Sequence, residues 1–213
     1  MMFKERMEAG RQLASALQPY RGLPCTVFAL VRGGVPVATE IAKMLGLPLR
    51  LLLVRKIGLP LNPEVAMGAV VGGEHPIAVR NEEVIRSFRV SDQVFESCCN
   101  REIEEIRRRE RVYALGAADE DLTRQIAIIV DDGLATGATA KVAIKALKAR
   151  RAYKVVVAVP VGAPEAIAQV KREADDVVCL EMPDHFTALS LHYQQFPQLT
   201  DQDVLRAIQA GQA

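Results

Sequence analysis

The stretch IIVDDGLATGAT, residues 128–139, decides the fold, because it joins an apolar run to two adjacent carboxylates and then to a loop of small residues. In open α/β sheets, ligands bind at the carboxyl ends of the strands, which is where Asp131 and Asp132 stand. The loop from Gly133 to Thr139 has little side-chain bulk, so its backbone N–H groups can surround an anion at the start of the next helix. The stretch therefore predicts a phosphate site beside a carboxylate pair.

Short apolar runs alternate along the chain with segments of helical periodicity, which is the pattern of a mainly parallel sheet covered by helices. The predicted strands are rich in Val, Ile and Leu, as strands buried on both faces should be. They span residues 25–31, 48–54, 125–131, 154–160 and 176–182. The predicted core helices span residues 36–46, 139–150 and 163–174, and Gly46 is a suitable residue to end the first of them. Two amphipathic segments, 2–18 and 200–210, are expected to pack on this core.

Two regions interrupt the alternation. Residues 67–80 place small and apolar residues around Gly72 and Gly73, which predicts an inserted hairpin. Residues 91–116 predict a long helix with an apolar stripe, formed by Phe95, Cys99, Ile103, Ile106 and Tyr113. Its charges are of both signs, with i,i+4 pairs such as Glu104–Arg108 and Glu105–Arg109, so we expect a solvated face and not a basic docking surface.

Composition limits the class of protein. The 213 residues fit one domain, and half of them are hydrophobic without an apolar run near the roughly 20 residues that span a bilayer. The first twenty residues resemble neither a signal peptide nor a transit peptide, so the cytoplasm is the expected compartment. Cys25, Cys98, Cys99 and Cys179 have no C-x-x-C spacing and are expected to be buried thiols and not part of a zinc site or a disulfide scaffold. A net charge of +1 lacks the basic excess typical of nucleic-acid binding.

Common nucleotide motifs do not fit the opening stretch. A Walker A loop needs one more residue between its glycines than Gly133 and Gly137 allow, and Ala138 stands where that motif has lysine. The dinucleotide pattern G-x-G-x-x-G is also missing from it. Carboxylates next to a phosphate would repel the phosphate, so their expected partners are hydroxyl groups or a metal that accompanies the ligand. A phosphorylated sugar meets both requirements.

A second segment carries similar chemistry. The strand at 25–31 is followed by Arg32, Gly33 and Gly34, where absent side chains let the backbone approach an anion and the arginine supplies charge. The next predicted strand is followed by Arg55 and Lys56, ahead of a loop that carries Gly58, Pro60 and Pro63. Solvated cations beside a plain turn are the alternative interpretation of both segments.

The stretch at 128–139 resembles the ribose-phosphate signature of type I phosphoribosyltransferases, in which two acidic residues separate an apolar strand from a T-G-x-T phosphate loop. The resemblance implies that Asp131 and Asp132 bind the ribose 2- and 3-hydroxyls of phosphoribosyl pyrophosphate. It implies that the 5-phosphate lies on the loop residues Ala135, Thr136, Gly137, Ala138 and Thr139. The implied fold is a Rossmann-like parallel-sheet core with helices on both faces, an inserted hairpin and a small hood.

The resemblance also assigns the leaving group. Arg32, Gly33, Gly34, Arg55 and Lys56 would bind pyrophosphate, and the loop after Lys56 would act as a mobile cover. Cleavage at ribose C1 builds positive charge on the sugar and negative charge on pyrophosphate. The implied catalytic residues are Asp131, Asp132, Arg32 and Lys56. Magnesium is expected to arrive with the pyrophosphate and to contact Asp131 and Asp132.

The acceptor is less defined. In the enzymes that salvage hypoxanthine and guanine, an aspartate that can serve as general base precedes the T-G of the loop, and here that position is Ala135. The segments VRKIG, NPE and GAV after the second strand are similar to uncharacterised bacterial members of the family. Phe186 and Tyr193 in the expected hood would either stack on a planar base or pack the last helix. Asp184 and His185 are further candidates for acid–base chemistry, and no metal-ligand spacing involves the histidines.

The leading interpretation is a magnesium-dependent transferase of phosphoribose to a nitrogenous acceptor. We expect a single domain over residues 1–213, with a core at about 20–182, a hood at about 183–213 and the N-terminal helix nearby. A non-catalytic sensor of phosphoribosyl pyrophosphate or a nucleotide, including an RNA-binding regulator, is the alternative, since the same loop can report a ligand without turning it over. Another reaction on a phosphoribosyl compound and the oligomeric state, including a homo-oligomer, stay open.

Overall fold

The computed structural model describes residues 2–113 and 122–212. The chain forms two compact units. The first combines Met1–Leu52 with Asp121–Ala213, and the second is Leu53–Glu120, which is inserted into the sequence of the first. The expectation of a single domain, with its core at about 20–182 and its hood at about 183–213, stays a prediction.

The first unit is built on a parallel sheet with the strand order β2-β1-β6-β7-β8. β1 (Cys25–Leu30) and β6 (Ile126–Val130) are buried along their whole length, because neighbouring strands flank them and helices cover both faces. The others are β2 (Leu49–Leu52), β7 (Lys154–Val161) and β8 (Asp176–Glu181). Each strand coincides with a predicted apolar run to within two residues, so the predicted α/β fold is confirmed.

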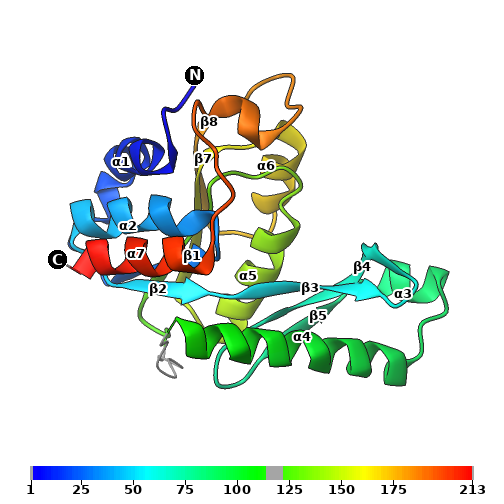
Figure 1. Cartoon of the computed structure of the whole chain (residues 1–213). Coiled ribbons are helices and arrows are strands. Elements are labelled where there is room, and N and C mark those ends of the chain that lie inside the picture. The colour runs from blue at the N-terminus through cyan, green and yellow to red at the C-terminus, as the bar shows by residue number, and fades with distance from the viewer. Residues whose placement is uncertain (1, 114–121, 213) are drawn as a thin grey trace. The chain divides into compact units, whose positions relative to one another are not determined.

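Helices lie on both faces of this sheet (Figure 1). One face carries α1 (Arg6–Ala16), α2 (Gly34–Leu45) and α7 (Asp201–Gln212), and the other carries α5 (Ala138–Ala149) and α6 (Pro164–Val170). The short 3₁₀ helices are η1 (Gln18–Tyr20) and η2 (Leu189–His192). Gly46 ends α2 with a left-handed φ of 67°, as predicted. The predicted helix at 163–174 is shorter than expected, because the N–H groups of Glu173 and Ala174 both bond to the Val170 carbonyl and close it.

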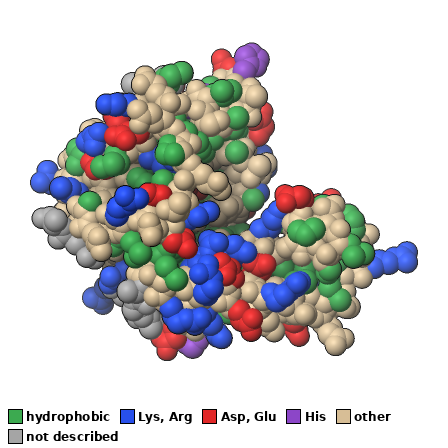
Figure 2. Space-filling view, in the orientation of Figure 1, with side chains coloured by type: hydrophobic (Ala, Val, Ile, Leu, Met, Phe, Trp, Pro, Cys, Tyr) green, Lys and Arg blue, Asp and Glu red, His purple; other side chains and the backbone are tan. Residues whose placement is uncertain are grey.

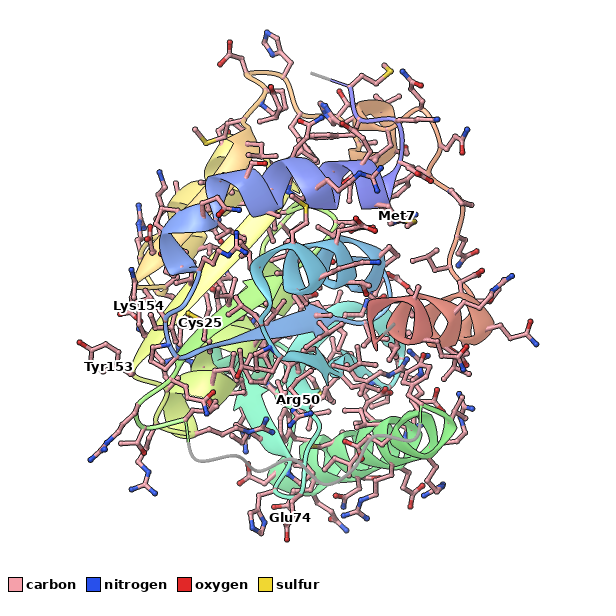
Figure 3. All side chains as sticks on the ribbon, turned by 90° about the vertical axis from the view of Figure 1, so that its left-hand side faces the viewer. Met7, Cys25, Arg50, Glu74, Tyr153 and Lys154 are labelled. Carbon is pink, nitrogen blue, oxygen red and sulfur yellow. The ribbon has the colours of Figure 1, made fainter. Side chains whose placement is uncertain are left out.

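A polar cluster secures the amino ends of the last two strands. The Tyr20 hydroxyl donates to Asp176 Oδ2 at 2.5 Å, and Lys154 Nζ lies 3.2 Å from both the hydroxyl and the carboxylate. Figure 3 shows Lys154 and Cys25 near each other at this edge. Burial raises the pKa of Tyr20, and the hydrogen bond from Tyr20 lowers the pKa of Asp176. The cluster therefore fastens η1 to the sheet at the edge away from Asp131.

The second unit is a three-stranded antiparallel sheet with the order β3-β4-β5. Its strands are β3 (Val54–Leu59), β4 (Asn62–Val71) and β5 (Ile77–Arg80), followed by α3 (Glu82–Ser87) and α4 (Asp92–Val112). The register Val71↔Ile77 and Gly68↔Arg80 confirms the hairpin predicted at 67–80.

The region after the second predicted strand differs from the expectation. The strand predicted at 48–54 stops at Leu52, and Val54 already belongs to β3 of the other sheet. Arg55 and Lys56 therefore lie inside β3 and not at a strand end. The predicted loop is a β-hairpin with a tight turn at Pro60 and Leu61, since β4 pairs back along β3. The sequence did not reveal the change from β2 to β3, because the apolar run at 48–54 continues across it.

α4 begins after Ser91, whose hydroxyl accepts a hydrogen bond from the Val94 N–H at 3.4 Å. Most of the predicted stripe is buried on its inner face, with Ile103 half-buried. Glu105 accepts from both Arg108 and Arg109, and these hydrogen bonds lower the pKa of Glu105 to about 2. The predicted 105–109 pair is confirmed. On the face shown in Figure 2, basic and acidic side chains are interspersed, in keeping with a solvated surface.

The remaining composition-based expectations concern cysteines and membranes. Cys25, Cys98 and Cys99 are buried free thiols, as predicted, whereas the free thiol of Cys179 is only half-buried. Within the described ranges, none of the helices is long and apolar enough to cross a bilayer.

Candidate functional site at the carboxyl ends of the central strands

The predicted acid pair follows β6, one of the central strands of the first sheet. Val130 pairs with Ala29 of β1 on one side and with Ala158 of β7 on the other. Asp131 and Asp132 therefore leave the sheet at its carboxyl edge, where parallel α/β folds bind ligands. The structure confirms the position that the sequence predicted for them.

Asp132 is held by groups far away in the sequence. Arg6 Nε donates to Asp132 Oδ2 at 2.7 Å, and the two side chains are only 9% and 11% exposed. The Tyr193 hydroxyl donates to the Asp132 backbone carbonyl at 2.7 Å. Burial, followed by the charge of Asp132, raises the pKa of Tyr193, so the phenol keeps its proton and remains a donor.

Arg6 itself is fixed by the C-terminal segment. One of its terminal nitrogens donates to the Pro197 carbonyl at 2.9 Å, and its guanidinium carbon lies 3.7 Å from the centre of the Phe196 ring. A planar guanidinium suits this combination of a fork of donors and an aromatic face. The first helix and the chain after Tyr193 thus enclose Asp132 together.

Gly33 and Gly34 are explained by close contacts within the site. A Cβ at Gly33 would lie 2.3 Å from Asp132 Oδ2, and a Cβ at Gly34 would lie 2.3 Å from the Val130 carbonyl oxygen. The absent side chains therefore make room for β6 and its carboxylate. Arg32 precedes them after a cis peptide bond from Val31, and its half-buried side chain makes no hydrogen bond within residues 2–113 and 122–212.

Asp131 has a more open environment. It is half-buried, and its Oδ1 accepts the backbone N–H of Asp132 at 2.9 Å. Removal from water and the adjacent Asp132 carboxylate raise the pKa of Asp131 well above its usual range. An anionic or protonated Asp131 can serve a hydroxyl group as acceptor, and the protonated form can also donate.

The loop after the acid pair is buried and anchored at Gly133 and Leu134 and is mostly exposed from Ala135 onward. The Leu134 N–H donates to the Val161 carbonyl at 2.9 Å, and the Leu134 carbonyl accepts from the Ala163 N–H at 2.8 Å. A Cβ at Gly133 would lie 2.2 Å from the Leu189 side chain. Exposed positions then follow on both sides of the buried Gly137, at Ala135, Thr136, Ala138 and Thr139.

Gly137 precedes the first residue of α5 and adopts a left-handed φ of 70°. This conformation favours glycine and turns the exposed loop into the helix, which begins at Ala138. The N-terminus of α5 carries the positive end of the helix dipole. The predicted phosphate loop therefore has the local geometry that the sequence indicated: small, exposed and at a helix start.

The other predicted anion contacts lie in the second unit. Arg55 forms an ion pair with Glu102 at 2.7 Å, and Lys56 lies 3.3 Å from Glu64 in a more exposed setting. Both cations thus have acidic partners inside their own unit. Their assignment to pyrophosphate stays a prediction.

The two predicted acceptor-pocket residues have different surroundings. Tyr193 is buried, and its ring lies 5.6 Å from the Phe3 ring and 4.8 Å from the Phe196 ring. Phe186 is half-buried and stacks on His192 at 5.5 Å. Tyr193 is therefore part of the buried packing next to Asp132. Phe186 is the less enclosed of the two rings.

Sequence reasoning missed Arg6. It lies on the buried face of α1 together with Ala9, Leu13 and Ala14. A charged residue at a position that should be apolar was the available signal, because such a residue needs a buried partner. The partner lies 126 positions away, so the local pattern could not identify it.

A magnesium ion fits this site only together with a ligand. The described ranges, 2–113 and 122–212, contain no group of three or more His, Cys, Asp or Glu side chains that could hold a metal. Mg²⁺ is commonly bound through one or two carboxylates and the phosphates of a substrate. Asp131, which lies outside the ion pair between Arg6 and Asp132, has the donor chemistry for this arrangement.

Comparison with known proteins decides the family. The family model described as "Phosphoribosyl transferase domain" matches residues 4–194, which contain β1, the acid pair and the loop at 133–139. The chain belongs to the phosphoribosyltransferase family. The resemblance inferred from residues 128–139 is confirmed, and Arg6 and Tyr193 both lie inside the matched range.

Relatives and solved structures agree with this. Two Mycobacterium tuberculosis proteins, each named "Putative phosphoribosyl transferase", are 43% identical over 204 residues and 96% of this chain. The chain spans about half of these relatives, 46% of their length. The crystal structure of TT1426 from Thermus thermophilus is 40% identical, with a TM-score of 0.81 and 98% of both chains covered. A Neisseria gonorrhoeae protein with bound ppGpp is 16% identical with a TM-score of 0.51, and it shares the fold.

Proposed function

We propose that this chain binds phosphoribosyl pyrophosphate together with magnesium and transfers its phosphoribosyl group to a nitrogenous acceptor, with release of pyrophosphate. The observation that carries the proposal is the arrangement after β6: a carboxylate pair at the centre of the parallel sheet, followed directly by an exposed loop of small residues at a helix start. Family membership supports it at the level of a transferase. We further propose that the protein acts in the cytoplasm.

The roles follow from the chemistry of each group. The ribose hydroxyls would be received by the pair Asp131 and Asp132, and the 5-phosphate by the N–H groups and hydroxyls from Ala135 to Thr139. Arg32, with no side-chain hydrogen bond among the described residues, is the proposed contact for pyrophosphate. The assignment of Arg55 and Lys56 to pyrophosphate, which the family resemblance implies, is kept as part of the proposal and requires both cations to exchange their acidic partners.

In the proposed reaction, the acceptor nitrogen forms a bond to ribose C1 while the C1–O bond breaks, and pyrophosphate leaves with the bonding electrons. Positive charge develops on the ribose, and the nearby carboxylate oxygens stabilise it. Arg32 stabilises the negative charge on the leaving group. Magnesium, when bound, supplies further charge neutralisation on the pyrophosphate oxygens. The proton lost by the acceptor nitrogen goes to solvent or to a base outside the loop, since position 135 is alanine.

That alanine also favours a second candidate. Ala135 is exposed and carries no acid–base group at the position where one branch of the family has aspartate. A non-catalytic sensor of phosphoribosyl pyrophosphate or of a nucleotide would need the loop and the acid pair but no base. The net charge of +1 lacks the basic excess that an RNA-binding regulator would favour.

Calorimetric titration with phosphoribosyl pyrophosphate, with and without magnesium, tests the ligand. We expect binding that strengthens with magnesium, and no binding under either condition would refute the proposal. A screen of purine, pyrimidine and pyridine bases for pyrophosphate release then tests transfer. Release with one acceptor identifies the enzyme, whereas binding without release from any of them supports the regulator.

A further inference from the structure

The two adjacent carboxylates of the site have different surroundings. Asp132 forms a buried ion pair with Arg6 at 2.7 Å. Asp131 receives the backbone N–H of Asp132 at 2.9 Å, and no side chain in residues 2–113 and 122–212 donates to it. Asp131 is also the more exposed of the two. The pair therefore does not present two equivalent groups to a ligand.

The carboxylate of Asp132 is enclosed from two directions. On one side, Arg6 is itself bound to the Pro197 carbonyl and lies over the Phe196 ring. On the other side, the carboxylate rests against Gly33, where a Cβ would lie 2.3 Å from Oδ2 and 2.7 Å from Oδ1. To turn toward a sugar, Asp132 would have to leave a buried cation without its partner, which is among the costly changes in a protein interior.

We infer that Asp131 is the carboxylate that receives a ribose hydroxyl, and that Asp132 is held by Arg6 as a fixed wall behind the turn at Gly33. The inference rests on the proposed function and narrows it, because the family resemblance assigns both acids to the ribose. Arg6 is then a positioning residue, which acts on the ligand through Asp132 and Gly33.

The ion pair also has an electrostatic consequence for the ligand. Two free carboxylates beside the loop at 135–139 would both repel a bound phosphate. Arg6 carries a permanent positive charge and offsets the charge of Asp132 in their ion pair. Asp131 forms no ion pair within the described residues, although the charge of Arg6 also acts on it. The site thus keeps an acceptor for a hydroxyl group at a smaller cost in repulsion.

The test compares Asp131→Asn with Asp132→Asn in two titrations, one with phosphoribosyl pyrophosphate and one with inorganic pyrophosphate, both with magnesium. Pyrophosphate lacks the ribose 5-phosphate part of the ligand, so the ratio of the two affinities reports the contacts to that part. Both variants keep the loop at 135–139 unchanged, and a difference between their ratios therefore reports the contact to the ribose. We expect Asp131→Asn to lower this ratio at least tenfold. Asp132→Asn should lower it less than threefold while lowering the melting temperature. Glu40→Gln is the matched control for both measurements. Glu40 forms an ion pair with Arg11, which lies on the same helix as Arg6.

An equal loss of the ratio in the two folded variants would overturn the inference and leave the proposed function intact. If the wild-type protein does not bind phosphoribosyl pyrophosphate, the proposed function fails. The melting temperatures of the variants then still test whether Arg6 holds Asp132 in place. Should Asp132→Asn not fold, Arg6→Gln with Asp132→Asn replaces it, since the double variant has no unpaired buried charge. A tenfold lower ratio in that double variant would also contradict the inference.

Discussion

The buried pair between Arg6 and Asp132 gives the sharpest prediction about stability. Its two side chains are 9% and 11% exposed, so either single substitution leaves a charged group without a partner inside the protein. Such a loss costs about 3–5 kcal/mol. For a chain of this length, each kcal/mol shifts the melting temperature by about 2–4 °C, so Arg6→Gln and Asp132→Asn should each lower it by roughly 6–20 °C. The assay is thermal unfolding followed by circular dichroism, with urea unfolding at 25 °C for the free energies.

The double variant Arg6→Gln with Asp132→Asn separates the pair from its surroundings. Because it removes both charges, its cost should fall short of the sum of the single costs by about 2–3 kcal/mol, at the upper end of couplings between contacting residues. Arg11 and Glu40 form the matched control, since Arg11 is also on α1 but 45% exposed, at 3.3 Å from its partner. Glu40→Gln should cost at most about 1 kcal/mol, because it leaves only the 45% exposed Arg11 without a partner, whereas the Glu40 side chain is 14% exposed. Equal shifts for the Asp132 and Glu40 variants would refute the reasoning.

Three further predictions follow from single contacts. Tyr193→Phe leaves the buried Asp132 carbonyl without its donor and should lower the free energy of unfolding in urea by about 1–3 kcal/mol. The control is Tyr153→Phe, which should have no effect because Tyr153 is 75% exposed (Figure 3). Equal effects of the two substitutions would contradict this prediction. Gly34→Ala places a Cβ 2.3 Å from the Val130 carbonyl oxygen of β6, and β6 cannot move away because it pairs with strands on both sides. We expect a destabilisation of about 1–3 kcal/mol. An unchanged melting temperature would contradict this prediction. The pKa of Glu105 is lowered from 4.5 to about 2, so its stabilising effect is complete above pH 4.5 and is lost as the pH falls toward 2. The free energies of unfolding of the wild type and of Glu105→Gln, measured in urea, should differ by at most about 1 kcal/mol above pH 4.5. This difference should shrink as the pH falls toward 2.

Much of the first unit could be predicted from local patterns. A strand buried on both faces must be apolar throughout, so its position is visible in the sequence as a run of Val, Ile and Leu. The acid pair and the loop after it were located correctly because they are contiguous with such a strand, Ile126–Val130. Gly46 likewise marked the end of α2 through its own backbone preference.

The errors and omissions have a common cause, which is that the deciding partner is distant. Leu53 lies between two strands of different sheets, and the apolar run around it continues through the change. The reason for Gly33 is the carboxylate of Asp132, and that carboxylate is held in turn by Arg6. Interactions of this length depend on the assembled fold and leave only weak traces in the local sequence.

The enclosure of Asp132 has a consequence for how the protein is synthesised. Arg6 leaves the ribosome long before Asp132, and Tyr193 and Pro197, which complete the contacts around both, emerge later still. During translation, the Arg6 guanidinium therefore has no Asp132 carboxylate to pair with until β6 and the two residues after it have been synthesised. A nascent chain that stops between residues 139 and 193 already contains the acid pair and the predicted phosphate loop, yet it lacks the Tyr193 hydroxyl and the Pro197 carbonyl that complete the contacts around Asp132 and Arg6. Completion of the site is thus a late event in the biogenesis of this chain.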